Sequence, residues 1–145
     1  MKKRRSQKKS RPAAAPEDLH GDQRRQLKAY LSRYCRAHEQ CGILQARLRH
    51  IHAETDNPAA DIRTRIQRQA EAARECMAEI VDVLDLLPVS TERTILELRH
   101  IDCKSWWEIQ HTVHLSRSSC YAYYQRGLDW LLAMPVVRGR LKYIS

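Results

Sequence analysis

The residue types that could catalyse a reaction or hold a metal ion are scattered along this chain. Its seven histidines include no HExxH motif and form no cluster with cysteines at metal-ligand spacing. His111 and His114 are one helical turn apart and could share a metal ion, but no third ligand lies in evident reach. The sequence contains no recognisable Ser/His/Asp arrangement and no glycine-rich phosphate loop. We therefore expect no catalytic residue, no metal site, no cofactor and no enzymatic activity.

The cysteines do not form a recognisable framework either. They are five in number, which is odd, and they stand at Cys35, Cys41, Cys76, Cys103 and Cys120. No CxxC pair and no zinc-ligand spacing occurs among them. We expect all of them to be reduced and to serve as small, half-apolar fillers.

Positive charge is the remaining chemistry, and it is unevenly distributed. The net formal charge is +9. Residues 1–11 carry +7, residues 12–87 carry −1 and residues 88–145 carry +3. Because most of the basic residues stand at one end, the charge alone does not locate a binding surface on the folded part.

The basic N-terminal segment, residues 1–16, combines charge, serine and two prolines without an apolar period. Such a segment cannot bury enough apolar surface to fold, so we expect a disordered basic arm. Its Lys2, Lys3, Arg4 and Arg5 would contact phosphates without reading sequence, because each neutralised phosphate releases counterions. A purely solubilising tail is the alternative.

The composition predicts the elements that must position any binding residues. Glycine and proline are scarce, at four and five residues, and phenylalanine is absent. Such a composition favours helices, so we expect an all-α fold in one or two domains. No apolar stretch approaches the roughly 18 residues of a membrane span, and no apolar signal segment follows the charged start. We expect a cytoplasmic, nucleoid-associated protein without a membrane partner.

Two apolar stripes predict an antiparallel, coiled-coil-like helical hairpin over residues 17–87. The first stripe lies between Asp22 and about Glu54, and the second between Asp61 and Leu87, either side of a turn near Asn57-Pro58. The first contains Leu27, Tyr30, Tyr34, Ala37, Cys41, Leu44, Leu48 and Ile51, and the second Ile62, Ile66, Gln69, Ala73, Cys76, Ile80, Val83 and Leu87. Antiparallel pairing brings Ile51 to Ile62 and Ile66, Cys41 to Ala73 and Cys76, and Leu27 to Leu87. So narrow a hairpin is marginal alone, which favours a homodimer or a docked partner over packing only within the chain.

Residues 88–134 predict three shorter helices. Ser90 or Thr91 caps the first. Ser105 forms a capping box with Glu108 at the second, and Ser116 caps the third. The third helix has an apolar ridge of Cys120, Tyr124, Leu128 and Leu131, and we expect it to end at Met134 because Pro135 cannot continue it. Residues 135–145 would then be a C-terminal tail. Two short helices joined by a tight turn to a longer one are typical of a helix-turn-helix, whose last helix enters the DNA major groove.

The same segment resembles a known family. The motifs are Leu87-Pro88, Glu92-Arg93, Ile95–Arg99, Lys104–Ile109, Ser116–Ser118 and Arg126–Leu128. They resemble region four of bacterial sigma factors, and still more the phage and prophage proteins of Gram-positive bacteria that include the ArpU-type late transcription regulators. The resemblance covers residues 87–132. Where this family usually has a glycine in the turn the chain has His114, and where it has an alanine in the third helix the chain has Gly127.

The resemblance implies binding of promoter or operator DNA through the helix that begins at Ser116. Base-contacting residues would be those that point away from the ridge, namely Arg117, Ser118, Tyr121, Ala122 and Gln125. Arg117 is the best placed, because a guanidinium in the first turn can pair with guanine O6 and N7. Phosphate-contacting residues would be Lys104, Ser105, Ser116 and Arg126.

Two functions from different classes follow. The first is a sequence-specific transcription regulator of phage or prophage type that binds double-stranded DNA. The second is an interaction module whose hairpin docks RNA polymerase, a sigma factor or phage packaging machinery, with the helix-turn-helix retained mainly as a scaffold. A small terminase subunit, which pairs such a domain with an oligomerising helical part, would stand between the two. A domain charge of only +3 after residue 87 is low for a stand-alone DNA-binding protein. That charge favours a dimer, help from the basic arm, or help from RNA polymerase.

Overall fold

The structure is a computed structural model that describes residues 16–51 and 57–142, with side chains described for residues 21–51 and 60–142. All the regular structure in these stretches is helical, which confirms the all-α expectation for this part of the chain. The helices are α2 (Pro16–Leu31), α3 (Arg33–Ile51), α4 (Asn57–Leu84), α5 (Thr91–His100), α6 (Trp106–Val113), α7 (Arg117–Leu132) and α8 (Pro135–Lys142). Residues 1–15, with Lys2, Lys3, Arg4 and Arg5, lie outside the described residues.

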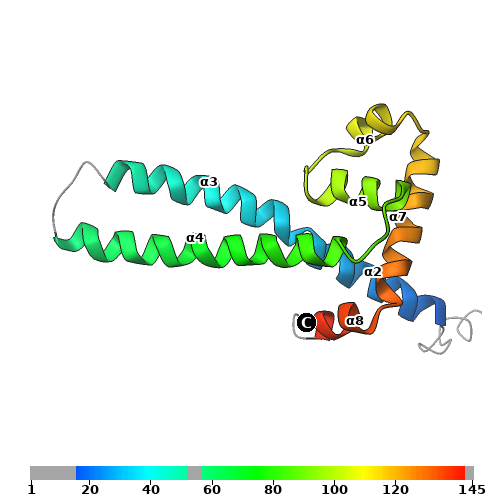
Figure 1. The fold of residues 1–145 in the computed structure, drawn as a ribbon, viewed down its shortest axis with the longest axis horizontal. Helices are drawn as coiled ribbons and strands as arrows, with labels where there is room; N and C mark the ends of the chain where they lie inside the picture. Colours follow the sequence, from blue (N-terminus) through cyan, green and yellow to red (C-terminus); the bar gives the residue numbers. More distant parts are fainter. Residues whose placement is uncertain (1–15, 52–56, 143–145) are drawn as a thin grey trace, which may run out of the picture.

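Helices α3 and α4 lie side by side and run in opposite directions, and the other helices gather at one end of this pair (Figure 1). The contact near the far end buries Leu44, Ile66 and Ala70, with Leu48 and Ile51 packed against them. A second cluster joins Cys41 to Ala73 and Cys76, as the apolar periodicity predicted. One layer differs, because Gln69 is exposed and its neighbour Ala70 takes the buried place. Ile62, expected to pack against Ile51, is 46% exposed.

The first predicted helix is interrupted and changes partner along its length. Instead of one helix from Asp22 to about Glu54, the chain forms α2 and α3 with a break at Ser32. Helix α2 lies against α7 and α8 (Figure 1), and near its C-terminus Tyr30 also donates a hydrogen bond to Glu79 of α4. The apolar stripe extends through both helices, so its periodicity does not indicate that α2 and α3 pack against different helices.

The second predicted helix begins earlier than expected. It was predicted from Asp61, after a turn containing Asn57-Pro58, but α4 begins at Asn57. A proline in the first turn costs no helical hydrogen bond, because the first N–H groups have no partner within the helix. The Asn-Pro pair therefore marks the start of α4.

The main core lies where α2, the end of α4 and the C-terminal helices meet. It contains Leu27 and Leu31 from α2, Leu84 from α4, Ile95 from α5 and Leu128 from α7, all at most 1% exposed. Leu87 belongs to the same cluster as Leu27, so that predicted contact region is present. The cluster contains residues from both sides of the predicted boundary at Leu87.

Arg93 connects α5 to the end of α4. Its guanidinium donates to the carbonyl of Leu87 at 2.9 Å and to the carboxylate of Asp85 at 2.7 Å. Glu97, one turn further along α5, accepts from the same side chain at 3.1 Å. Three acceptors around one half-buried arginine fix the direction in which α5 leaves the α3–α4 pair.

The end of the chain differs from the expected tail. Helix α7 ends at Leu132, and Pro135 begins α8 instead of ending structure altogether. Val137 and Leu141 of α8 are buried in the main core. Proline is suited to the first position of a helix, where its missing N–H has no partner to lose. The prediction of a tail over residues 135–142 was therefore wrong.

The expectation of five reduced cysteines is also wrong, because Cys35 and Cys103 form a disulfide. Their Cα atoms lie 6.0 Å apart although 68 positions separate them in the sequence. Such a pair arises only when α3 folds against the link between α5 and α6, so no local spacing announces it. Cys41, Cys76 and Cys120 are free thiols.

Candidate nucleic-acid interface

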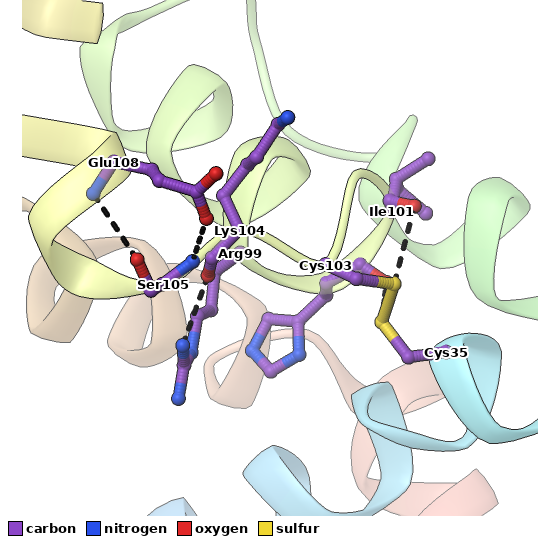
Figure 2. The surroundings of a disulfide bond; sticks show 8 residues. Cys35, Arg99, Ile101, Cys103, Lys104, Ser105 and Glu108 are labelled. Carbon is purple, nitrogen blue, oxygen red and sulfur yellow. Dashed lines mark hydrogen bonds between the residues drawn. A yellow bond between two sulfur atoms is a disulfide. The ribbon is translucent and has the colours of Figure 1, made fainter. Parts of the chain in front are cut away.

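Each of the three helices α5, α6 and α7 begins at a serine whose side chain caps it. The hydroxyl of Ser90 accepts from Arg93 N at 3.2 Å, and that of Ser116 accepts from Ser119 N at 3.2 Å. Ser105 and Glu108 form the complete capping box predicted from the sequence, with reciprocal hydrogen bonds of 3.2 and 2.9 Å (Figure 2). The backbone and side chain of Ser105 lower the pKa of Glu108. These caps define where α6 and α7 begin.

The turn between α6 and α7 is closed by His114. Its φ of 59° and ψ of 43° place it in the left-handed region, and its N–H donates to the carbonyl of Gln110. Glycine adopts this conformation most easily, and histidine does so more readily than most other side chains. The link between the two helices is therefore only three residues long.

Helix α7 is held by the predicted ridge. Cys120, Tyr124, Leu128 and Leu131 are all buried. The helix comes close to α5 at Gly127, where an added Cβ would lie 2.6 Å from Leu96 Cδ1 and 3.4 Å from Glu92 Cβ. A glycine at this point lets α5 and α7 approach each other more closely than an alanine would.

The five base-contacting candidates on α7 differ in exposure. Arg117, Ser118 and Ala122 are exposed near its N-terminus. Tyr121 is 40% exposed, and its ring packs edge-on against Trp106 with centroids 4.8 Å apart. Gln125 is half-buried, and its Oε1 is enclosed without a hydrogen-bond partner among the described residues. The open part of this face is the first turns of α7.

The phosphate-contacting candidates are engaged within the chain to different degrees. Arg126 donates to Glu92 at 3.0 Å and lies over the ring of Tyr123, yet half of its side chain is exposed. The Ser105 and Ser116 hydroxyls are engaged as helix caps. Lys104 extends away from the disulfide (Figure 2), while its carbonyl accepts from Arg99 at 2.9 Å. Lys104, Ser105 and Ser116 thus stand at the N-termini of α6 and α7, where helix dipoles favour anions.

Helix α2 covers one side of α7, which the sequence did not predict. Arg24 makes two hydrogen bonds to Asp129, at 2.8 and 2.7 Å. The ammonium group of Lys28 lies 5.8 Å from the ring centroid of Tyr121 and 5.7 Å from that of Tyr124. Arg24 and Asp129 are 105 positions apart, so no helical spacing could have linked them. The neighbouring half-buried Gln125 marks how far along α7 the exposed face extends.

A buried polar pair lies beneath the aromatic side chains of this region. His100 is 3% exposed, and its Nε2 lies 2.8 Å from the hydroxyl of Tyr124. Burial, helped by the charges of Arg99 and Lys28, lowers the pKa of His100 to about 3. Burial also raises the pKa of the Tyr124 hydroxyl. Both side chains are therefore neutral at ordinary pH, and His100 joins α5 to Tyr124 on the ridge of α7.

The metal-binding question can be put to the described residues directly. Within residues 16–51 and 57–142, no three His, Cys, Asp or Glu side chains come together as a metal-binding group. His111 instead lies against Trp107, with ring centroids 3.9 Å apart, and its Nδ1 is 2.8 Å from that residue's carbonyl oxygen.

No protein-family model, no curated protein and no solved structure matches the chain. Across the described helices, none combines the length and the apolar character needed to span a membrane.

Proposed function

We propose that this chain is a sequence-specific, double-stranded-DNA-binding transcription regulator of phage or prophage type. In this proposal α3 and α4, with part of α2, form an antiparallel hairpin, and α5, α6 and α7 form a helix-turn-helix domain similar to sigma factor region four. The observation that supports it most is the first turn of α7. It carries Arg117 and Ser118 exposed on the surface, directly after the tight turn at His114.

The division of roles follows from position on α7. Arg117 would read a guanine through two hydrogen bonds, and Ser118, Tyr121 and Ala122 would contact neighbouring base edges. Gln125 would take part only at the margin of the site, since it is half-buried. Lys104, Ser105 and Ser116 would position the duplex through its phosphates, as would Arg126 if it exchanges Glu92 for a phosphate.

The low net charge of the C-terminal domain indicates that DNA binding needs contacts from elsewhere. Residues 88–145 carry a net charge of +3, which can neutralise only a few phosphates. Residues 1–11 carry a net charge of +7. We therefore propose that the basic arm, with Lys2, Lys3, Arg4 and Arg5, adds phosphate contacts, and that the chain acts in the cytoplasm on the nucleoid. A homodimer through the α3–α4 pair, or contact with RNA polymerase, would supply further affinity.

Selection of bound fragments from a random duplex DNA pool at near-physiological salt tests this function. The full chain should enrich a defined motif, and an inverted repeat within it would indicate a dimer. Arg117→Ala should weaken the preference at one base pair by about 1–3 kcal/mol. Arg65→Ala is the matched control, because Arg65 is an exposed arginine on α4, outside the proposed reading helix. A pool that stays random with the full chain would overturn the proposal.

The exposed Trp107 favours a second candidate, an interaction module that docks through α6 rather than through the hairpin. Trp107 is 66% exposed, and its ring lies against that of His111 with centroids 3.9 Å apart. Tryptophans of this kind commonly anchor protein interfaces. If the random pool stays random, this candidate predicts that purified RNA polymerase holoenzyme retains the chain and that Trp107→Ala abolishes retention. Retention unchanged by Trp107→Ala would contradict an interface at α6.

A further inference from the structure

The disulfide connects two segments that belong to different parts of the fold. Cys35 lies in the first turn of α3, and Cys103 lies in the link between α5 and α6 (Figure 2). Ser105, the residue that caps α6, follows Cys103 by two positions. The bridge therefore sets how far the N-terminus of α6 stands from α3.

Apart from the bridge, the link is held by hydrogen bonds to α5, since the N–H groups of Ile101 and Asp102 both donate to the carbonyl of Glu97. Lys104 N donates to the carbonyl of Leu98, and Arg99 donates to the carbonyl of Lys104, both at 2.9 Å. Cys103 has a φ of 58°, in the left-handed region that a residue with a Cβ rarely adopts. His114, at the other end of α6, is the only other non-glycine residue with positive φ in the described part of the chain. Helix α6 is thus flanked at both ends by residues in a disfavoured conformation.

The bridge is open to a small reagent. Cys103 is exposed, Cys35 is half-buried, and both line a shallow surface hollow with Ser32, Arg99 and His100. The free Cys41 and Cys120 are buried by comparison.

The surroundings suit both oxidation states of the two cysteines. Cys35 Sγ lies 3.3 Å from the carbonyl oxygen of His100, and Cys103 Sγ lies 3.6 Å from that of Ile101 (Figure 2 draws the second). A sulfur in a disulfide carries no proton, so these are contacts and not hydrogen bonds in the oxidised chain. After reduction each thiol can donate to the carbonyl already beside it. Reduction therefore leaves neither sulfur without a partner.

We propose that the Cys35–Cys103 disulfide is a thiol-exchange site that acts as a clamp on α6. The oxidised form fixes the N-terminus of α6, and reduction by a dithiol releases it. Lys104 and Ser105 adjoin this terminus, so reduction lowers the affinity for DNA; this last step rests on the proposed function. In a reducing cytoplasm the clamp closes only when conditions become oxidising.

The exchange proceeds in two balanced steps. One thiolate of the dithiol attacks Cys103 Sγ, the bond between the two cysteines breaks, and Cys35 leaves as a thiolate that takes up a proton. The second thiol of the reagent then attacks the mixed disulfide as a thiolate. Cys103 leaves and is protonated, and the reagent becomes a cyclic disulfide. Two electrons pass from the dithiol to the protein.

The test equilibrates the full chain in oxidised or reduced dithiothreitol and measures three quantities. Alkylation under denaturing conditions should count three reactive thiols in the oxidised chain and five after reduction. Amide hydrogen exchange over residues 101–108 should be slower in the oxidised chain. Binding to a mixed-sequence duplex at low salt should weaken on reduction by roughly fivefold, which is the low end for coupled sites.

Three variants separate the bridge from the fold. Cys103→Ser should behave like the reduced chain in either buffer. Cys103→Gly should also behave like the reduced chain. Because glycine adopts a positive φ without steric strain, this variant replaces the serine variant if that one folds poorly. Cys76→Ser removes a thiol outside the bridge and should keep the full redox response.

The outcomes distinguish the clamp from the function on which it acts. Five reactive thiols in the oxidised chain, or equal exchange over residues 101–108 in both buffers, would overturn the clamp. A redox-dependent exchange rate with unchanged DNA affinity would overturn its coupling to DNA. If neither form binds DNA while exchange still responds to redox, the proposed function fails and the clamp stands.

Discussion

His100 carries an uncharged imidazole in the folded chain. It is buried against Tyr124, and its pKa is lowered to about 3, mainly by burial, from an ordinary value of 6.5. The unfolded chain therefore binds a proton between these two values that the folded chain does not. The contribution of the uncharged His100 to folding stability is therefore fully present above pH 6.5, and it is lost as the pH falls towards 3.

We expect the free energy of unfolding to fall by up to about 1.4 kcal/mol per pH unit between pH 6 and 4 through His100 alone. Urea denaturation at several pH values measures this slope. His100→Gln cannot take up the proton, so it should show a flatter profile. His50→Gln, an exposed site on α3, should keep the slope of the parent chain. Parallel profiles for the parent and His100→Gln would contradict the argument.

Two glycines in helices should respond oppositely to alanine. At Gly127 a new Cβ would lie 2.6 Å from the buried Leu96, so overpacking of about 1–3 kcal/mol outweighs the roughly 1 kcal/mol gained in helix propensity. At Gly42 on α3 a Cβ meets nothing within 4 Å, so Gly42→Ala should stabilise the chain by about 0.5–1 kcal/mol. Thermal or urea unfolding of both variants compares them directly. Equal effects would mean that α5 and α7 separate easily at their crossing.

Helix α8 is a structural part of the main core. Val137 is completely buried, while the adjacent Val136 is 53% exposed. Val137→Ala should cost about 2 kcal/mol of unfolding free energy, because it removes two buried methyl groups and leaves a cavity. Val136→Ala, the same change one residue earlier, should be close to neutral. The unfolding free energies of the two variants check this, and equal costs would show that α8 does not dock.

The elements that the sequence predicted best are those with local signals. The caps at Ser90, Ser105 and Ser116 each depend on a hydrogen bond that spans three residues, so the sequence alone contains both partners. The ridge of α7 depends on helical periodicity in the same way. The predictions that failed were those that depend on contacts between residues far apart in the sequence. Pro135 is compatible with the end of a helix or the start of one, and the contact that decides is the main core around Val137.

The uneven distribution of charge along the chain predicts the salt dependence of the proposed DNA binding. The seven Lys and Arg of residues 1–11 would each release counterions when they neutralise a phosphate, at a slope of about 0.9 per phosphate. Replacing all seven with Gln keeps the length and should reduce the slope of log affinity against log salt by up to about 6 units. Binding titrations between low and moderate salt measure this. An unchanged slope would exclude the arm from the interface.

The sequence predicted where helices form better than it predicted how those helices pack together. The contacts that place α2 on α7 join Arg24 to Asp129 and Lys28 to Tyr121, across most of the chain. The same is true of the Cys35–Cys103 bridge. The candidate site on α7 was found from local patterns, whereas the packing of α2 on α7 depends on these long-range pairs.

The packing of α2 against α7 also has a consequence for the order of events during synthesis. Leu27, Tyr30 and Leu31 leave the ribosome early, but much of the core that buries them lies in helices made last. The α3–α4 pair can form while translation continues, because its two halves are adjacent in the chain. The apolar face of α2 has to wait until α7 emerges. A nascent chain stalled before Arg117 would therefore expose that face, and chaperones that hold hydrophobic segments would bind it at this stage.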